Sequence, residues 1–168
     1  GLVALDPSSG ALLPWNARLI GFTVPTLPTS PATVEKLAVA SGRLYVAGVF
    51  ESAGGAPRTR FAVLDAATGD ALPGTLPLNT FVSGLTATAT RVFVQGNCIP
   101  LGYAVCAYAA DMTPVPGWTF PLSSGLLLAG PSALYSTEAT TSGPPFGFKI
   151  VARDLDTGVA LPFAAPVI

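Results

Sequence analysis

Two cysteines, Cys98 and Cys106, are the residues of this 168-residue chain whose spacing most directly indicates chemistry. A hairpin through Gly102, which lies between them, would bring their Cα atoms within the roughly 4.4–6.8 Å that a disulfide needs. A redox-active pair would need a lowered thiol pKa, but the two residues have neither Cys-x-x-Cys spacing nor an adjacent basic residue. We therefore expect a structural disulfide, typical of secreted proteins, with two small buried thiols as the alternative.

Carboxylates are the second candidate for chemistry. The chain has nine Asp and Glu residues, and a glycosidase pair would have to come from acids such as Glu35, Glu51, Asp70, Asp111 and Glu138. Glu35 and Glu51 flank predicted strand ends, where solvated acids are the commoner case. The chain has no histidine, which excludes Ser-His-Asp and Cys-His catalysis and His-ligated zinc. We expect no catalytic residue, metal or cofactor in this chain.

The composition favours an extracellular β protein. Half of the residues are hydrophobic and 10% are charged, and 18 glycines and 17 prolines argue against long helices. The net charge of −1 gives no electrostatic footprint for nucleic acid, so we expect no such partner. Mean hydropathy is +0.58, but the longest apolar stretch, 125–135, is interrupted by Pro131 and Ser132. Since a membrane span needs roughly 20 apolar residues, we expect none.

A nine-residue pattern, Asp-x-x-(Ser/Thr)-Gly-x-x-Leu-Pro, occurs three times, and residues 108–118 fit as a shortened copy. The Asp and Gly positions are Asp6 and Gly10, Asp65 and Gly69, and Asp154 and Gly158. In such a turn the Asp accepts hydrogen bonds from N–H groups two or three residues on, and the glycine takes a positive φ. Calcium needs about 6–8 oxygens, which one Asp per turn does not supply, so we expect structural turns.

Runs of β-branched and aromatic residues surround these turns and predict strands. They cover residues 2–5, 34–40, 44–48, 61–64, 82–89, 92–96, 126–129, 134–136 and 150–152. Their order gives a four-stranded antiparallel unit repeated every roughly 40–60 residues, which is the size of a β-propeller blade. We place a half-blade at 1–15, a linker at 16–33, and blades near 34–76, 82–120 and 125–163.

The number of blades creates a difficulty for the propeller. About 3.5 blades do not close a ring that normally has 4–8. An open arc would leave edge strands and apolar blade faces exposed. We therefore expect a segment of a longer propeller, or one whose open edges a partner chain covers. A β-sandwich is the alternative fold.

The motifs resemble those of known propellers. Residues 64–69 and their two sister copies look like the blade signature of quinoprotein-type bacterial propellers, in which a docking tryptophan follows a few residues later. Trp15 and Trp118 stand about where that tryptophan would lie, whereas Gly74 and Phe163 replace it in the other copies. Residues 46–65 are also similar to roughly sixty-residue propeller repeats of large secreted bacterial proteins, a family mostly of unknown function. The resemblance implies a secreted or surface-exposed bacterial propeller and does not imply a reaction.

Aromatic and basic side chains supply the binding candidates. Tyr45, Phe93 and Tyr135 recur at equivalent repeat positions, which indicates core. Less constrained positions, where we expect exposed rings, are Tyr103, Tyr108, Phe146 and Phe148. Arg58 and Arg60 follow a Gly-Gly pair, so the loop either binds an anion or uses these arginines for its own hydrogen bonds.

We therefore expect a non-catalytic extracellular or cell-surface scaffold that binds a protein or glycan partner through loops on one propeller face. The alternative is part of a hydrolase or quinone-dependent oxidoreductase whose catalytic residues lie outside these residues. Quinone-dependent dehydrogenases of the resembling type carry vicinal cysteines and a calcium site, whereas the cysteines here are eight positions apart.

Overall fold

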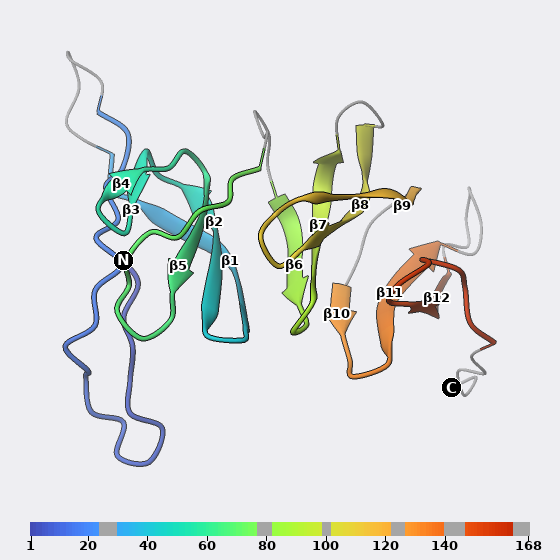
Figure 1. Ribbon diagram of the computed structural model, residues 1–168, viewed down its shortest axis with the longest axis horizontal. Coiled ribbons are helices and arrows are strands. Elements are labelled where there is room, and N and C mark those ends of the chain that lie inside the picture. Colours follow the sequence, from blue (N-terminus) through green and yellow to red (C-terminus); the bar gives the residue numbers. More distant parts are fainter. Residues whose placement is uncertain (24–29, 77–81, 99–101, 122–126, 140–146, 163–168) are drawn as a thin grey trace. The chain divides into compact units, whose positions relative to one another are not determined.

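The computed structural model describes residues 1–23, 30–76, 82–98, 102–121, 127–139 and 147–162. Within them the regular secondary structure is β-strand, paired antiparallel, which confirms the predicted all-β class (Figure 1). No helix in these ranges is long and apolar enough to cross a membrane. The chain forms two compact units, Gly1–Phe81 and Val82–Ile168, and their boundary falls between two predicted repeats.

The first unit is built on a three-stranded sheet in the order β1-β2-β5. Its strands are β1 (Thr33–Ala40), β2 (Arg43–Val49) and β5 (Phe61–Asp65), and a separate hairpin joins β3 (Ser52–Ala53) and β4 (Ala56–Pro57). The three long strands lie where the apolar runs predicted them. Because β-branched and aromatic side chains fit a pleated, half-buried surface, these runs favour strands over helices.

One face of this sheet is covered by the N-terminal segment of the same unit. Leu44 lies opposite Leu64, and Val46 lies opposite Ala62, so the four side chains share one face. All four are buried, and Trp15 from the N-terminal segment packs against this cluster. Ala17, at the start of the predicted linker 16–33, is also buried in this cluster, so the linker begins in the core of the first unit.

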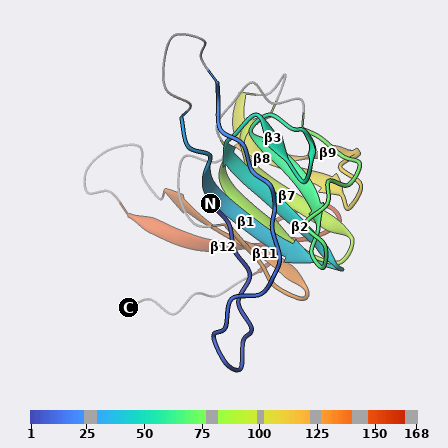
Figure 2. The same cartoon turned by 90° about the vertical axis from the view of Figure 1, so that its left-hand side faces the viewer.

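Residues 2–5 do not form the predicted strand. Within the described chain their β pairing is a single bridge between Leu5 and Leu12, across the turn that starts at Asp6. A strand needs a ladder of hydrogen-bonded partners on at least one side. Among the described residues, this segment is bridged only to Leu12, on the other side of its own turn. In Figures 1 and 2 the dark blue turn of this first hairpin extends beyond the β1-β2-β5 sheet.

The second unit contains two antiparallel sheets. One has the order β6-β7-β8-β9, from β6 (Val82–Ala87), β7 (Arg91–Cys98), β8 (Gly102–Ala109) and β9 (Pro114–Pro121). The other has the order β10-β11-β12, from β10 (Leu127–Ala129), β11 (Ala133–Ala139) and β12 (Phe148–Asp154). A buried cluster joins the two sheets through Phe93, Trp118, Leu127 and Leu134, among others.

The four strands predicted for every blade are present in only one repeat among the described residues, at β6–β9. In the β5 and β12 repeats the fourth strand is reduced to one bridge, Leu64 to Ala71 and Arg153 to Ala160. The next backbone bonds, from Leu72 and Leu161, are followed in the sequence by Pro73 and Pro162. Proline has no N–H with which to continue a ladder, so the predicted fourth strand stops after a single bridge in these two repeats.

The three turns with the repeated motif have the same hydrogen bonds. In each, the Asp carboxylate accepts N–H groups from the residues two and three positions on, at 2.8–3.0 Å. The glycine N–H donates back to the carbonyl of that Asp, at 2.8 Å in two copies and 3.0 Å in the third. Gly10, Gly69 and Gly158 have φ values of +70°, +79° and +71°, the left-handed region where a side chain is unfavourable.

Each of the two tryptophans lies against the motif glycine of the following turn. A Cβ added at Gly69 would lie 3.4 Å from Trp15 Cε2 and 2.5 Å from the Asn16 carbonyl oxygen. A Cβ added at Gly158 would lie 3.3 Å from Trp118 Cε2. A Cβ added at Gly10, by contrast, would have no atom of the described chain within 4 Å. The glycines thus let an indole ring approach the backbone in two of the three turns.

We predict that alanine substitutions at these three glycines will distinguish two losses in the free energy of unfolding. One comes from the left-handed backbone conformation, and the other comes from disturbing the tryptophan contact. Gly10→Ala should destabilise its unit by about 1 kcal/mol, because only the backbone conformation is affected. Gly69→Ala and Gly158→Ala should cost about 1–3 kcal/mol more, because the added methyl group also meets packed atoms. Urea denaturation of the three variants measures the difference, and equal losses would contradict the tryptophan contact.

Candidate functional site

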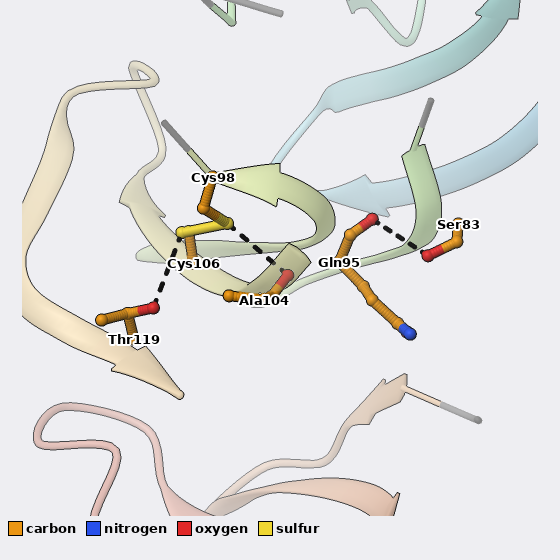
Figure 3. The surroundings of a disulfide bond; sticks show 6 residues. All are labelled: Ser83, Gln95, Cys98, Ala104, Cys106 and Thr119. Carbon is orange, nitrogen blue, oxygen red and sulfur yellow. Dashed lines mark hydrogen bonds between the residues drawn. A yellow bond between two sulfur atoms is a disulfide. The ribbon is translucent and has the colours of Figure 1, made fainter. Parts of the chain in front are cut away.

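A disulfide links Cys98 at the end of β7 to Cys106 in β8, with the Cα atoms 6.3 Å apart (Figure 3). In the ladder Cys98 lies opposite Gly102 and Cys106 opposite Val94, so the bond crosses the hairpin diagonally. The Thr119 hydroxyl of β9 lies 3.9 Å from Cys106 Sγ. The bond therefore closes the β7–β8 hairpin around the residues between the two cysteines.

The opposite face of the same hairpin carries a closed set of hydrogen bonds. The Gln95 side-chain amide donates to the Tyr103 hydroxyl at 3.3 Å, and the Tyr103 and Ser83 hydroxyls are bonded to each other. Ser83 also donates to the Gln95 carbonyl at 3.3 Å. Figure 3 shows the Gln95 side chain pointing away from the disulfide, as the alternation of side chains along a strand requires. Strands β6, β7 and β8 each contribute one residue to this set.

These bonds fix the Tyr103 side chain while leaving its ring accessible. Tyr103 is 47% exposed, whereas Gln95 is fully buried. With Gln95 donating to the phenol oxygen and Ser83 donating to the Gln95 backbone carbonyl, the Tyr103 proton is directed to Ser83. The Gln95 side-chain oxygen is buried and accepts no hydrogen bond from the described residues. Asn97 lies directly opposite Tyr103 in the ladder and is half-buried. The hairpin thus presents an aromatic ring beside a side-chain amide.

The other predicted aromatic positions have different surroundings. Phe148 is exposed on β12, and Phe146 lies outside the described residues. The expectation that Tyr108 is exposed is wrong: it is buried, on the face of β8 opposite Tyr103, and burial raises the pKa of its phenol. Two strand positions separate it from Cys106, so both lie on the same face of β8, opposite the face that carries Tyr103 and Val105. Of the aromatic residues predicted to lie in the core, Tyr45 and Phe93 are fully buried, whereas Tyr135 is half-buried.

The turn aspartates bind their own backbone. Hydrogen bonds from the Ser8 hydroxyl and then the Ser9 N–H hold the pKa of Asp6 well below its usual range. The Thr157 N–H and hydroxyl lower the pKa of Asp154 in the same way. In the described part of the chain no three Cys, Asp or Glu side chains come together as a group that could hold a metal ion. These carboxylates therefore act as turn acceptors.

The acids considered for glycoside hydrolysis have separate local roles. Asp70 pairs with Arg18, and Glu51 accepts the Thr23 hydroxyl at 3.1 Å in the first unit. In the second unit Glu138 binds Arg153 at 2.5 Å and Lys149 at 3.8 Å. Asp111 accepts the Thr113 N–H at 3.0 Å, and Glu35 is exposed on β1. Each acid is thus placed by a different element.

The Gly-Gly loop uses its arginines within the first unit. Arg58 donates to the carbonyls of Pro57 and Leu72, at 2.9 and 3.2 Å, and the Arg60 guanidinium lies 5.7 Å from the centre of the Phe22 ring. Arg18, which sequence reasoning missed, donates to the Gly54 carbonyl at 2.9 Å as well as to Asp70. These contacts match the loop-bonding interpretation of the arginines rather than anion binding.

We predict that the disulfide stabilises the second unit by about 2–3 kcal/mol, the loop-closure value for a bridge spanning so few residues. The double variant Cys98→Ser, Cys106→Ser should unfold at correspondingly lower urea concentration. Reduced wild-type protein is the matched control and should behave like the variant. Labelling of two thiols by an alkylating reagent before any reduction would contradict the bridge.

We also predict that stability falls in acid because of the turn carboxylates. The folded-state pKa of Asp154 lies below its ordinary value of 3.8, so the unfolded chain binds more protons at low pH. The contribution of ionised Asp154 to the free energy of unfolding is complete above its ordinary pKa of 3.8. It is lost as the pH falls through the lower pKa of the folded state. The urea midpoint of the second unit should therefore drop between about pH 5 and pH 2. Asp154→Asn, which keeps an acceptor oxygen, should show a weaker pH dependence, and an unchanged pH profile would contradict this assignment.

Comparison of this chain with protein families, curated proteins and solved structures finds no match in any of the three. The likeness to bacterial propeller repeats therefore stays a prediction from the motifs. What the structure adds is a chain built from antiparallel sheets, in which a tryptophan after one turn packs on the glycine of the next.

Proposed function

We propose that this chain is a non-catalytic extracellular scaffold, built from β-propeller-type repeats, that binds a glycan or protein partner through the β7–β8 hairpin. The observation that carries the proposal is the Tyr103 ring, exposed on a hairpin that a disulfide closes and hydrogen bonds hold in place. The partner would contact the ring face and the neighbouring Asn97 amide.

The rigidity of this hairpin is what makes it suitable for recognition. A tyrosine offers a large contact area at a small loss of conformational entropy, and rigid presentation lowers that loss further. Because the Tyr103 hydroxyl is already bonded to Ser83 and Gln95, a ligand would stack on the ring instead of competing for its proton. Asn97 would add donors and an acceptor for hydroxyl or peptide groups.

The propeller assignment is supported by the way the repeats contact one another. The ring of one repeat lies on the turn of the next in both units, at Gly69 and at Gly158. Stacking of similar units through nearest-neighbour contacts is how repeat proteins bury their apolar faces. The disulfide and the low charge favour an extracellular or bacterial cell-surface location.

The test is binding of the intact chain to a glycan array and to bacterial cell surfaces. Tyr103→Ala should weaken binding about tenfold or more, since exposed aromatic anchors carry much of the energy of small interfaces. Leu37→Ala, an exposed apolar residue of similar accessibility on β1, is the matched control and should bind as wild type. Loss of cell binding after glycosidase treatment indicates a glycan, and loss after protease treatment indicates a protein. Undiminished binding of Tyr103→Ala to every surface would overturn the proposed site.

A further inference from the structure

The strands that hold Tyr103 have counterparts in the first unit, so the same positions can be compared in two repeats. The run 92–96 in β7 matches the run 44–48 in β2, and the register shift near the start of β6 matches one near the start of β1. Strand β8 follows β7 in its sheet as β5 follows β2 in the other. Each residue around Tyr103 therefore has an equivalent in a repeat without this tyrosine.

Gln95 stands where the first unit has Ala47. Both residues are buried, each with 1% of its surface exposed. Ala47 shows that this kind of sheet forms with a small apolar side chain at the position. Gln95 instead buries an amide, and its side-chain oxygen accepts no hydrogen bond from the described residues. Because an unpaired buried polar atom lowers stability, the needs of the fold do not account for a glutamine here.

Gly84 lies opposite Gln95 in the ladder and leaves the space that its amide occupies. A Cβ added at Gly84 would lie 2.7 Å from Gln95 Oε1 and 3.0 Å from Gln95 Cβ. The backbone does not require this glycine, since Gly84 is not among the residues with a positive φ. In the first unit the residue paired with Ala47 is Lys36. The glycine thus occurs where the glutamine needs room, and a long side chain occurs where it does not.

Ser83 occupies the extra position at the register shift of β6. An irregularity of this kind turns a side chain away from the regular alternation of the strand. The Ser83 hydroxyl bonds to the Gln95 carbonyl, as Figure 3 shows, and to the Tyr103 hydroxyl. The equivalent residue in β1 is Glu35, which is exposed. The shift is therefore common to both repeats, whereas the serine that uses it is found beside Tyr103.

We propose that Ser83, Gly84 and Gln95 are positioning residues for the Tyr103 ring, and that Gln95 serves binding at this ring and not folding. The inference rests on the proposed function of the β7–β8 hairpin. Tyr103 stands two positions before the ladder partner of Gln95, and the equivalent residue of the first unit is Thr59. The first unit thus lacks the ring together with all of the residues that hold it. Gln95 donates to the phenol oxygen at 3.3 Å, so its loss would free the ring on that side.

Substitutions in the intact chain separate positioning from folding. Gln95→Leu removes the unpaired amide and keeps an apolar side chain of similar size, so the urea midpoint of the second unit should equal or exceed that of the wild type. Gly84→Ala should displace the Gln95 amide, which is the flexible end of its side chain. Thr86→Val on the same strand is the matched control. The Thr86 hydroxyl is buried and accepts the Ala129 N–H at 3.0 Å, so its loss should lower the urea midpoint without reaching Tyr103.

The ring and its binding are measured separately. NMR of a chain labelled on its tyrosine rings follows Tyr103, whose signal is assigned by its absence from Tyr103→Phe. Gln95→Leu and Gly84→Ala should each shift this signal and weaken binding to bacterial cell surfaces about tenfold, whereas Thr86→Val should do neither. Adding Gly84→Ala to Gln95→Leu should cause no further loss of binding, because both substitutions act through the same amide.

Each outcome bears on one part of the proposal. A Tyr103 signal that does not move in Gln95→Leu would overturn the positioning role, whatever the binding result. A clear fall in the urea midpoint of Gln95→Leu would show that the glutamine serves the fold, and Gln95→Met is the second variant if Gln95→Leu does not fold. If Tyr103→Ala binds as the wild type does, the proposed function is wrong, and the ring signal alone still decides the positioning role. If Tyr103→Ala binds less but Gln95→Leu does not, the positioning residues have no part in binding.

Discussion

The contact between an indole ring and a glycine of the next turn is the interaction on which the rest of this structure depends. Trp118 lies against Gly158 and also packs between Phe93 and Phe120, with ring centres 4.9 and 5.7 Å away. It therefore joins the β6–β9 sheet to the turn that follows β12. A single repeat of this size cannot bury both sides of its sheet, so its stability comes from the neighbour it touches. Glycine is favoured at Gly158 because its φ is +71° and an added Cβ would lie only 3.3 Å from Trp118 Cε2.

The parts of the fold that depend on local chemistry are predictable from the sequence. The Asp65 and Gly69 pair dictates a turn wherever it occurs, because its hydrogen bonds lie within a few residues. The strands follow where a neighbouring strand is available, since runs such as 44–48 fit a pleated, half-buried surface, whereas residues 2–5 lack a ladder and form one bridge. The fourth strand of two repeats was overestimated, because the effect of Pro73 on its ladder outweighs the apolar character of the residues before it.

The candidate site was only partly predictable. An exposed Tyr103 follows from its place near the end of a cysteine-bridged hairpin, but its bonds to Ser83 and Gln95 depend on the register of three strands. The cysteine spacing centres the hairpin on Gly102, whereas the ladder pairs Cys98 with Gly102 and Asn97 with Tyr103. Neither this register nor the position of β6 beside the hairpin follows from the sequence. Tyr108 shows the same limit, since alternation alone does not tell which side of a sheet is covered.

One further consequence concerns Gly74, which stands where a tryptophan would follow the second turn. The division of the chain into two compact units falls just after this residue. In a linear array, cooperativity passes from repeat to repeat only as strongly as each interface allows. Each unit holds its own indole–glycine contact, Trp15 on Gly69 and Trp118 on Gly158, so under mechanical tension each unit is expected to unfold as one cooperative segment.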